Sequence, residues 1–303
     1  MREVLVIGGN RYFGKRLIAR LIAAGDRVTV LNRGSAPPPP GAVQLIADRD
    51  DEAALVAALD GRTFDVVVDQ VCYTPRQAAI ARRVLTGRTA RYVMTSTVEV
   101  YEYEDSAEPV PEGALDPRTV IVTPQLPWEE PEFVTQHYGE GKRQAEAVFA
   151  RGDFPYVSVR VAHVLGGADD FTGRLAHYAD RIRAGEPVAV AVPDRPATYI
   201  QVDEIAAFLF WTTRQDFTGP VNAASHGPLM CEDIAGAVAD AVGGDRHAVR
   251  YRAVEVGAVS PFSFARSYGM DTSRAESLGF AFSHTGEWLT DAVAETLGTD
   301  RGL

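Results

Sequence analysis

Tyr138 and Lys142 are the residues of this chain whose types and spacing are best suited to chemistry. Lysine is rare, with two among the 30 basic residues, and the other lysine is Lys15. On a helix, residues four positions apart share one face, so the ammonium would lie beside the phenol. A nearby positive charge stabilises the phenolate and lowers a tyrosine pKa from about 10 toward neutrality. The pair therefore predicts a tyrosine that exchanges a proton with a substrate.

Three hydroxyl residues, Thr95, Ser96 and Thr97, stand at the end of an expected strand. A hydroxyl there can hydrogen-bond the substrate oxygen whose proton Tyr138 exchanges. Lys142 can also hold the ribose of a nicotinamide nucleotide, so we expect it to serve both catalysis and cofactor binding. The alternative is that Tyr138 and Lys142 form a surface pair and that the hydroxyls only cap the strand.

A glycine-rich turn lies between the first expected strand, at residues 3–7, and the first expected helix. Glycine lets a backbone turn tightly and approach a pyrophosphate, while the helix N-terminus supplies N–H donors. A strand before the turn and a helix after it are the context that a dinucleotide site requires. We expect the whole turn to bind the cofactor: Gly8, Gly9, Asn10, Arg11, Tyr12, Phe13 and Gly14.

Residues at other strand ends indicate which dinucleotide would bind. Where an acid would hold the ribose hydroxyls of NAD, the chain has Asn32 followed by Arg33. Because an arginine pairs with the 2′-phosphate that a carboxylate would repel, we expect NADP, with NAD as the alternative. Asp48 could accept a hydrogen bond from the adenine amino group. The Asp69 carboxylate could contact the ligand, but hydrogen bonds to its own loop would explain it equally well.

Apolar and turn patterns place these residues in an α/β fold. Strands are expected at 3–7, 27–31, 42–46, 64–69, 91–95 and 155–161, with helices at 13–24, 51–59, 75–85 and 138–151. This alternation predicts a doubly wound parallel sheet, Rossmann-like, over residues 1–165. Residues 166–303 are expected to form a smaller C-terminal α/β substrate lobe, partly interleaved with the first domain. Residues 102–136, rich in prolines and acids, are expected to be a functional lid or a disordered segment.

Composition limits the partners. Hydrophobic residues make up 46% and charged residues 23% of the chain, as in ordinary globular proteins, and no apolar run is long enough to span a membrane. The net charge of -11 argues against nucleic acid, which needs a positive surface. The two cysteines suit a reducing compartment without a disulfide or metal framework. We expect a cytoplasmic protein that binds a small molecule and no metal, as a monomer or a homodimer.

Together these residues resemble the short-chain dehydrogenase/reductase superfamily, in its extended, epimerase/dehydratase-like branch. Residues 138–142 are similar to that family's Tyr-x-x-x-Lys motif. Residues 95–101 are similar to its Ser-Ser-x-x-Val-Tyr strand end, which implies a catalytic hydroxyl at Thr97 with Ser96 beside it. Similar segments follow at 160–166, 199–206 and 271–280, so the resemblance covers nearly the whole chain. It implies a Rossmann-like fold, a nicotinamide cofactor and catalytic roles for Thr97, Tyr138 and Lys142.

Departures from the family pattern leave three functions open. Arg11 replaces the middle glycine of the turn, as in a subgroup that includes chloroplast stem-loop RNA-binding proteins. Ala197 stands where sugar-nucleotide epimerases carry an arginine that grips the diphosphate. We therefore expect an NAD(P)-dependent oxidoreductase that transfers a hydride to or from a small alcohol or carbonyl compound. The alternatives are an NAD-dependent sugar-nucleotide epimerase or dehydratase, and a non-catalytic RNA-binding protein on the same fold.

Overall fold

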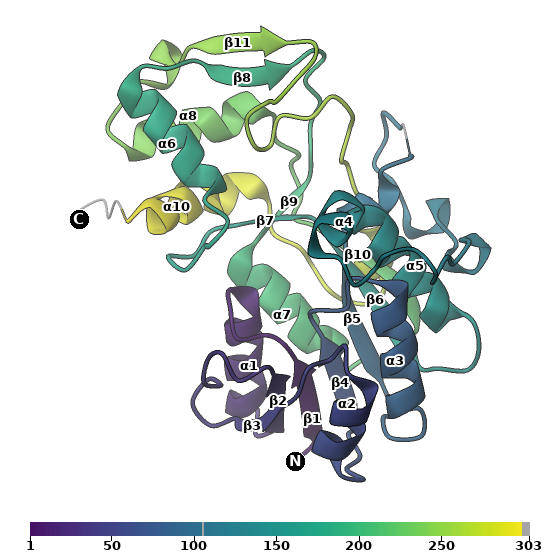
Figure 1. Cartoon of the computed structure of the whole chain (residues 1–303). Coiled ribbons are helices and arrows are strands. Elements are labelled where there is room, and N and C mark those ends of the chain that lie inside the picture. Colours follow the sequence, from purple (N-terminus) through teal and green to yellow (C-terminus); the bar gives the residue numbers. More distant parts are fainter. Residues whose placement is uncertain (105, 299–303) are drawn as a thin grey trace. The chain divides into compact units, whose positions relative to one another are not determined.

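The computed structural model describes residues 1–104 and 106–298, and it divides into two compact units (Figure 1). The first unit comprises residues 1–103, 112–161 and 206–222. The second comprises residues 104–111, 162–205 and those from 223 onward. The chain therefore crosses between the units several times, and residues 206–222, from the expected second lobe, belong to the first unit. Residues 299–303 of that expected lobe lie outside the described residues.

A seven-stranded sheet forms the centre of the first unit, in the order β3-β2-β1-β4-β5-β6-β10. Its strands are β1 (Glu3–Ile7), β2 (Arg27–Asn32), β3 (Val43–Ile46), β4 (Val66–Asp69), β5 (Tyr92–Thr97), β6 (Tyr156–Val161) and β10 (Gly219–Ala223). Neighbouring strands from β3 to β6 are parallel, and Ile7 lies level with both Leu31 and Asp69. The carboxyl ends of these strands therefore meet at one edge, and the predicted doubly wound fold is confirmed.

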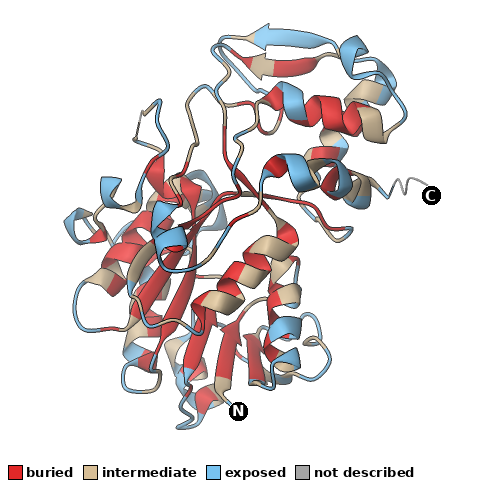
Figure 2. Ribbon diagram, turned by 180° about the vertical axis from the view of Figure 1, so that it is seen from behind, coloured by how far each residue is buried: buried red, intermediate tan, exposed pale blue. Residues whose placement is uncertain are grey.

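Helices cover both faces of the sheet, which is why the central strands are buried almost along their whole length, whereas the edge strand β3 exposes Val43 and Ile46 (Figure 2). α2 (Glu52–Leu59), α3 (Pro75–Leu85) and α5 (Tyr138–Ala150) pack on one face, against a core that includes Leu5, Tyr92 and Met94. α1 (Phe13–Ala23) and the last residues of α7 (Val202–Thr212) lie on the other face. The positions of α3 and of α5 agree with the sequence pattern, so Tyr138 and Lys142 do lie on one helix.

Local capping explains where two of these helices begin. The Thr74 side chain accepts a hydrogen bond from the backbone N–H of Gln77, and Pro75 follows in the first turn of α3. The Asp51 carboxylate accepts from the N–H of Ala54 at the start of α2. Strand β10, in contrast, has no local signal, because it begins with Gly219 and a proline, which are rare in strands. The sequence pattern therefore does not predict it.

Of the expected lid or disordered segment at 102–136, residues 112–136 belong to the first unit and pack on α5, and residue 105 lies outside the described residues. They contain the 3-10 helices η2 (Glu112–Ala114) and η3 (Pro117–Thr119), and α4 (Pro131–Gln136). The Gln144 Oε1 atom accepts a hydrogen bond from the N–H of Thr123 at 2.8 Å, and the indole of Trp128 is buried. These contacts explain why only a few side chains of α5 reach solvent, although the segment lacks helical or strand periodicity.

The second unit combines short strands with three longer helices. β7 (His163–Leu165) pairs with β9 (Tyr199–Gln201), and β8 (Val188–Ala191) pairs with β11 (Tyr251–Val254), both in parallel. α6 (Arg174–Ala184), α8 (Cys231–Ala241) and α10 (Thr285–Leu297) share a core that includes Leu175, Ile234 and Val293, and the shorter α9 (Ser273–Ser277) precedes α10. Strands β7 and β9 have three residues each and are too short for the pattern to predict, and β11 is not among the expected strands either. No helix within the described residues has the length and apolar surface that crossing a bilayer takes.

Candidate active site

The glycine turn joins β1 to α1 in a backbone conformation that side chains other than glycine rarely adopt. Gly8 and Gly9 have φ angles of 81° and 79°, in the left-handed region. A β-carbon on Gly14 would lie 2.6 Å from both the Cα and the carbonyl oxygen of Gly9. Only glycine at position 14 therefore lets the first turn of α1 pass this close to the end of β1, as a pyrophosphate-binding turn needs.

Three buried polar atoms around this turn have no hydrogen-bond partner within the described residues: Asn10 Oδ1, Asn32 Nδ2 and Gln70 Nε2. Asn10 belongs to the turn, Asn32 ends β2, and Gln70 follows β4. An unpaired buried polar group costs about 1–3 kcal/mol, so such groups normally meet a partner. Their position at the carboxyl ends of neighbouring strands fits the ribose and phosphate oxygens of a dinucleotide.

The residues expected to choose the coenzyme lie at the same edge of the sheet. Asn32 Oδ1 is already engaged, since it accepts hydrogen bonds of 2.8 Å from the N–H of Gly34 and from Gln44 Nε2. Arg33 is exposed directly after β2. Asp48 is also exposed, and its carboxylate accepts from the N–H of Asp50. Of the three, Arg33 is the side chain with the charge and freedom to pair with a phosphate.

The aromatic and basic members of the turn differ in exposure. Arg11 is exposed, whereas Tyr12 is buried and holds a φ of 54° at the start of α1. The Tyr12 and Phe13 rings lie 5.9 Å apart, centroid to centroid. The turn thus presents its backbone and the Arg11 side chain, while Tyr12 anchors it to the protein.

Lys142 is a charged residue that is only 1% exposed. Its Nζ atom donates a hydrogen bond of 2.7 Å to the carbonyl oxygen of Thr95 in β5. Burial lowers the pKa of Lys142 from 10.5 to about 8, and the Cys72 and Asp69 side chains partly oppose this fall. The ammonium is therefore held at the carboxyl end of β5 and kept charged at neutral pH.

Two tyrosine rings flank the Lys142 ammonium. Its Nζ lies 5.7 Å from the centroid of the Tyr138 ring and 4.6 Å from that of Tyr73. The two rings are 6.1 Å apart, and burial raises the pKa of Tyr73. A cation is attracted to the face of such rings, more strongly when water is excluded. Tyr73 is a site residue that the sequence pattern does not reveal, because it lies 69 positions before Lys142 in the chain.

The two glycines between Tyr138 and Lys142 explain how α5 can approach so closely. A β-carbon on Gly141 would overlap the carbonyl oxygen of Tyr73, and one on Gly139 would lie 2.6 Å from the carbonyl oxygen of Glu99. Both obstacles are backbone atoms, which do not yield as a flexible side chain can. Gly139 and Gly141 therefore set the distance between α5 and the ends of β4 and β5, and with it the place of both catalytic candidates.

Thr97 and Ser96 point to different surroundings, as successive residues of a strand do. Thr97 Oγ1 accepts a hydrogen bond of 3.2 Å from the N–H of Glu99, at the start of η1 (Val98–Tyr101). Ser96 Oγ instead donates to Glu146 Oε1 of α5 at 2.6 Å. The first hydroxyl keeps its own proton available, whereas the second is committed to a buried carboxylate.

Ser96 is part of a fully buried ionic network. Arg160, 0% exposed, forms a salt bridge of 2.7 Å with Glu146 and donates to the Tyr101 hydroxyl at 2.8 Å. It also donates to the carbonyl oxygens of Glu112 and Leu115, at the start of the segment that covers α5. Removing one partner of such a pair costs about 3–5 kcal/mol, because the other charge is left buried. This network fixes α5, β5 and β6 in place.

Asp69, the last residue of β4, lies in a second buried network. Its carboxylate accepts from Arg49 Nη2 at 2.6 Å, from the Tyr92 hydroxyl at 2.5 Å and from the N–H of Val71. Loop bonding, the alternative left open by the sequence, thus accounts for both carboxylate oxygens. Within residues 1–104 and 106–298, no three His, Cys, Asp or Glu side chains come together as metal ligands would.

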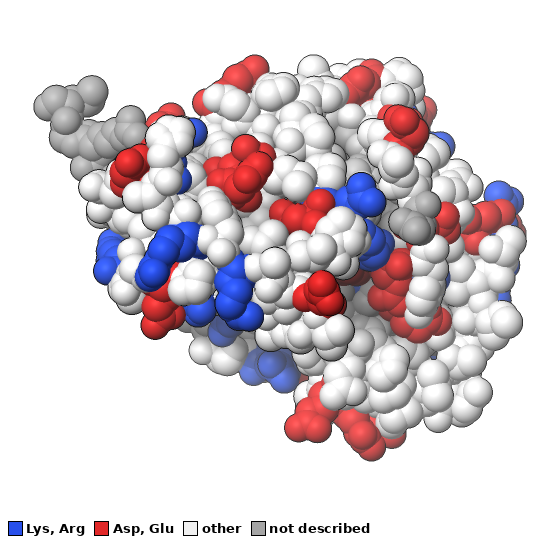
Figure 3. All heavy atoms as spheres, turned by 90° about the horizontal axis from the view of Figure 1, so that it is seen from above, with Lys and Arg blue, Asp and Glu red and all other residues white. Residues whose placement is uncertain are grey.

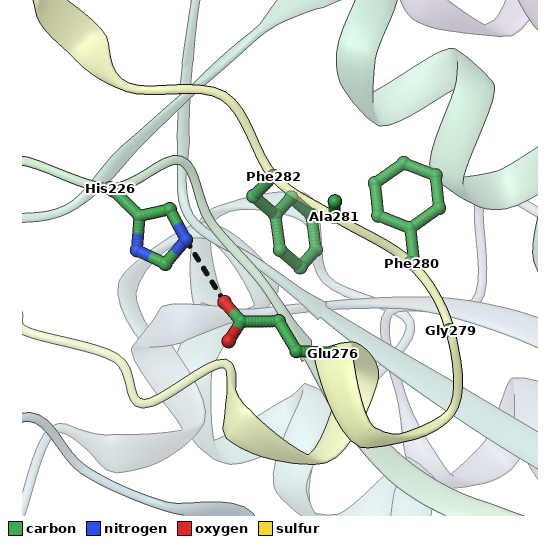
Figure 4. A pocket seen from close by; sticks show the side chains of 6 residues that line it. All are labelled: His226, Glu276, Gly279, Phe280, Ala281 and Phe282. Atoms are coloured by element: carbon green, nitrogen blue, oxygen red, sulfur yellow. Dashed lines mark ion pairs between the residues drawn. The ribbon is translucent and has the colours of Figure 1, made fainter.

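A hollow of about 420 Å³ lies in the second unit, and the residues that line it are distant in sequence from the catalytic and cofactor candidates. It is lined by His226, Glu276 and residues 279–282, and Figure 4 shows the imidazole and the carboxylate facing each other. The His226 Nε2 and Glu276 Oε1 atoms are 2.9 Å apart, and both side chains are partly exposed. None of the expected catalytic or cofactor residues lines this hollow.

A sequence profile described as the NAD dependent epimerase/dehydratase family matches residues 4–223, which contain the glycine turn, Thr97, Tyr138 and Lys142. The chain belongs to this family. The resemblance to the extended, epimerase/dehydratase-like branch is thereby confirmed, and the description of the family names NAD.

Three solved structures share this fold. WbmG from Bordetella bronchiseptica, solved with NAD and UDP, has a TM-score of 0.74 at 19% identity, over 98% of this chain and 93% of WbmG. UDP-glucose 4-epimerase from Thermotoga maritima, solved with UDP-glucose, has 0.73 at 19% identity, over 98% and 99%. dTDP-glucose 4,6-dehydratase from Bacillus anthracis, solved with NAD, has 0.74 at 11% identity, over 98% and 97%. At these identities the likeness establishes the fold.

One plant protein matches by sequence. Chloroplast stem-loop binding protein of 41 kDa b from Arabidopsis thaliana is 24% identical over 221 residues, which are 67% of this chain and 51% of the plant protein. The chain thus spans about half the length of this relative. The match agrees with the subgroup that Arg11 indicates.

Proposed function

We propose that this chain is a nicotinamide-dependent epimerase or dehydratase, in which a hydride taken from a hydroxylated carbon is returned before the product leaves. Membership of the epimerase/dehydratase family supports this alternative over the net oxidoreductase that the sequence favoured. The observation that carries the proposal is the Lys142 ammonium, buried beside the Tyr138 ring and hydrogen-bonded to the end of β5. A surface pair, the other interpretation of these residues, would leave Lys142 in water.

The residues of the chain would divide the work as follows. A nicotinamide ring, when bound, takes up and gives back the hydride. Tyr138 moves the proton on the substrate oxygen, and Lys142 stabilises the phenolate form by its charge. Thr97 donates its hydroxyl proton to the same oxygen, because its own oxygen already accepts from the N–H of Glu99. Ser96 holds α5 through Glu146 and acts on position alone.

Substituting Tyr138→Phe tests the proposal. The variant should lose turnover by about 10²–10⁴-fold, because the proton carrier is gone, while dinucleotide binding stays unchanged. Tyr103→Phe is the matched control, since Tyr103 is 72% exposed and its loss of a hydroxyl should leave turnover intact. Full turnover in Tyr138→Phe would refute the assigned role.

A second measurement separates hydride return from net redox chemistry. The purified protein should contain a dinucleotide that is released on denaturation, and it should convert substrate without added coenzyme. Stoichiometric consumption of added NADPH would instead support the net oxidoreductase.

The coenzyme is a separate proposal. We infer a preference for NADP from two residues. Arg33 is exposed at the end of β2, where a 2′-phosphate would lie, and position 32 holds an asparagine in place of the acid that would bind the ribose of NAD. The NAD in the structures of WbmG and of the dehydratase supports the opposite choice for those proteins. Dissociation constants for the two dinucleotides decide between them.

RNA binding is the candidate that the name of the plant relative raises. The net charge of -11 opposes it, and acidic and basic side chains are interspersed on the face drawn in Figure 3. Retention of a stem-loop RNA on a filter, weakening steeply with added salt, would support this function; no retention at low salt would exclude it.

A further inference from the structure

Tyr73 presents its ring to the Lys142 ammonium. The Lys142 Nζ atom lies 4.6 Å from the centroid of the Tyr73 ring, closer than the 5.7 Å that separates it from the centroid of Tyr138. All three residues belong to the first unit, and Tyr73 lies in the loop between β4 and α3. The face of an aromatic ring carries partial negative charge, so it attracts an ammonium, and more strongly where water is excluded.

The Lys142 ammonium has little else to stabilise its charge. Of its three N–H donors, one is used within the described residues, in the hydrogen bond of 2.7 Å to the Thr95 carbonyl oxygen. Over the same part of the chain, no carboxylate forms an ion pair with it. The ring faces therefore offset part of what the ammonium loses when it leaves water.

The charged and titratable groups around Lys142 are committed elsewhere. Those that act on its charge are Asp69 at the end of β4, Cys72 in the loop after it, Glu146 on α5 and Arg49 after β3. Asp69 forms a salt bridge of 2.6 Å with Arg49, and Glu146 forms one of 2.7 Å with a buried arginine. Burial raises the pKa of the Cys72 thiol to about 11, so it is neutral at neutral pH. None of these groups replaces the Tyr73 ring.

The backbone of Tyr73 is fixed against the helix that carries Lys142. A β-carbon on Gly141 would overlap the Tyr73 carbonyl oxygen, so the two backbones touch one residue before the lysine. The Tyr73 N–H donates a hydrogen bond of 2.7 Å to Gln77 Oε1 of α3. The Tyr73 hydroxyl has no hydrogen-bond partner among residues 1–104 and 106–298. The ring, and not the hydroxyl, is therefore the part of Tyr73 that acts on Lys142.

We propose that Tyr73 is a positioning residue, whose ring face holds the Lys142 ammonium charged and in place beside Tyr138. Tyr73 acts through Lys142 and transfers no proton itself. The inference rests on the proposed function for its purpose, because the ammonium serves turnover only if Tyr138 moves a proton. An apolar side chain at position 73 leaves the ammonium buried without the attraction of the ring, which favours the neutral amine.

NMR titration of the full chain, labelled with ¹³C at the lysine ε-carbons, tests this proposal. The chain has two lysines, so two signals are expected, and Lys15→Met assigns them. Tyr73→Leu should lower the pKa of Lys142 from about 8 to about 7, a fall of about 10-fold in its proton affinity. Tyr73→Phe keeps the ring and should leave this pKa unchanged.

Tyr103→Leu is the matched control. The Tyr103 ring lies over a different cation, at 4.3 Å from the Arg143 Cζ atom, so its loss should not change the Lys142 titration. Turnover is the second measurement. At about pH 7.5, Tyr73→Leu should lower kcat by about 3-fold or more, because a smaller fraction of Lys142 is charged, and Tyr73→Phe should retain kcat. At about pH 6 the ammonium is charged in both proteins, so the difference in kcat should shrink.

An unchanged pKa of Lys142 in Tyr73→Leu would overturn the proposal, and so would an equal fall in Tyr73→Phe. Should Tyr73→Leu not fold, the wild type decides. Ring currents should then place the ε-protons of Lys142 upfield of those of Lys15, and coincident signals would refute the ring contact. The titration needs no substrate. Full turnover in Tyr138→Phe would therefore refute the proposed function and leave the result for Tyr73 standing.

Discussion

Replacing Lys142 by methionine should make the folded protein more stable while it abolishes activity. The ammonium is buried, and the fall of its pKa from 10.5 to about 8 corresponds to a cost of about 3 kcal/mol at neutral pH, at about 1.4 kcal/mol for each pKa unit. Methionine has no charge to bury and nearly fills the same volume. The variant also loses the hydrogen bond to the Thr95 carbonyl oxygen, which offsets about 1–2 kcal/mol of the stabilisation from removing the charge. We expect a net stabilisation of about 1–2 kcal/mol.

The sign of the pH dependence follows from the direction of the shift. Because the folded-state pKa of Lys142 lies below its unfolded value, the unfolded chain binds more protons between about pH 8 and 10.5, and wild-type stability rises with pH there. Relative to Lys142→Met, the wild type should gain about 2 kcal/mol between about pH 7 and about pH 9.5. Burial raises the pKa of Cys72 to about 11, so this thiol stays protonated in the folded state of both proteins.

Urea unfolding followed by circular dichroism at both pH values measures this difference. Lys15→Met is the matched control, since it removes the one other lysine, which is exposed, and should show no such pH-dependent difference from the wild type. If Lys142→Met and the wild type respond to pH alike, the ammonium is solvated and the argument for a buried catalytic charge fails. A variant that is both more stable and inactive would indicate that Lys142 is kept for function.

Three further predictions concern the same unit. Gly141→Ala should lower the free energy of unfolding by about 1–3 kcal/mol, because the added β-carbon meets the Tyr73 carbonyl oxygen. Gly113→Ala is the control in the same urea assay. Since there is open space around Gly113, this change should alter the free energy of unfolding by less than about 0.5 kcal/mol. Arg33→Ser should weaken NADP binding by about 10-fold or more and leave NAD binding unchanged, as fluorescence titration would detect. Thr97→Ala should lower kcat by about 10²–10³-fold, while Ser96→Ala should retain kcat and lose about 1–3 kcal/mol of stability.

Several charged side chains of the first unit are buried, although burying a charge costs free energy of folding. Lys142 is buried at a cost, Glu146 and Arg160 are buried as a pair, and Arg49, after β3, is buried with Asp69 at the end of β4. Apolar residues of similar volume would often serve folding as well or better. Polar groups in these places are best explained by what they hold in position: the end of β5, the start of α5 and the ring of Tyr73.

Local patterns in the sequence were sufficient for β1 to β6, for α1, α2, α3 and α5, and for several candidate site residues. The strand before Gly8 and the helix after Gly14 follow from apolar periodicity, and the pairing of Tyr138 with Lys142 follows from the pitch of a helix. Each of these signals lies within one turn or one strand, where neighbouring residues determine the backbone.

Contacts between distant segments were decided only by the tertiary structure. Tyr73 meets Lys142, and Gly141 passes the Tyr73 carbonyl, through packing of α5 on the loop after β4. Ser96 and Thr97 look equivalent in sequence, yet the alternation of β5 and the place of Glu146 direct their hydroxyls to different partners. Such pairs form only because one packing of the whole chain is more stable than all others. No periodicity or spacing within a short segment can therefore reveal them.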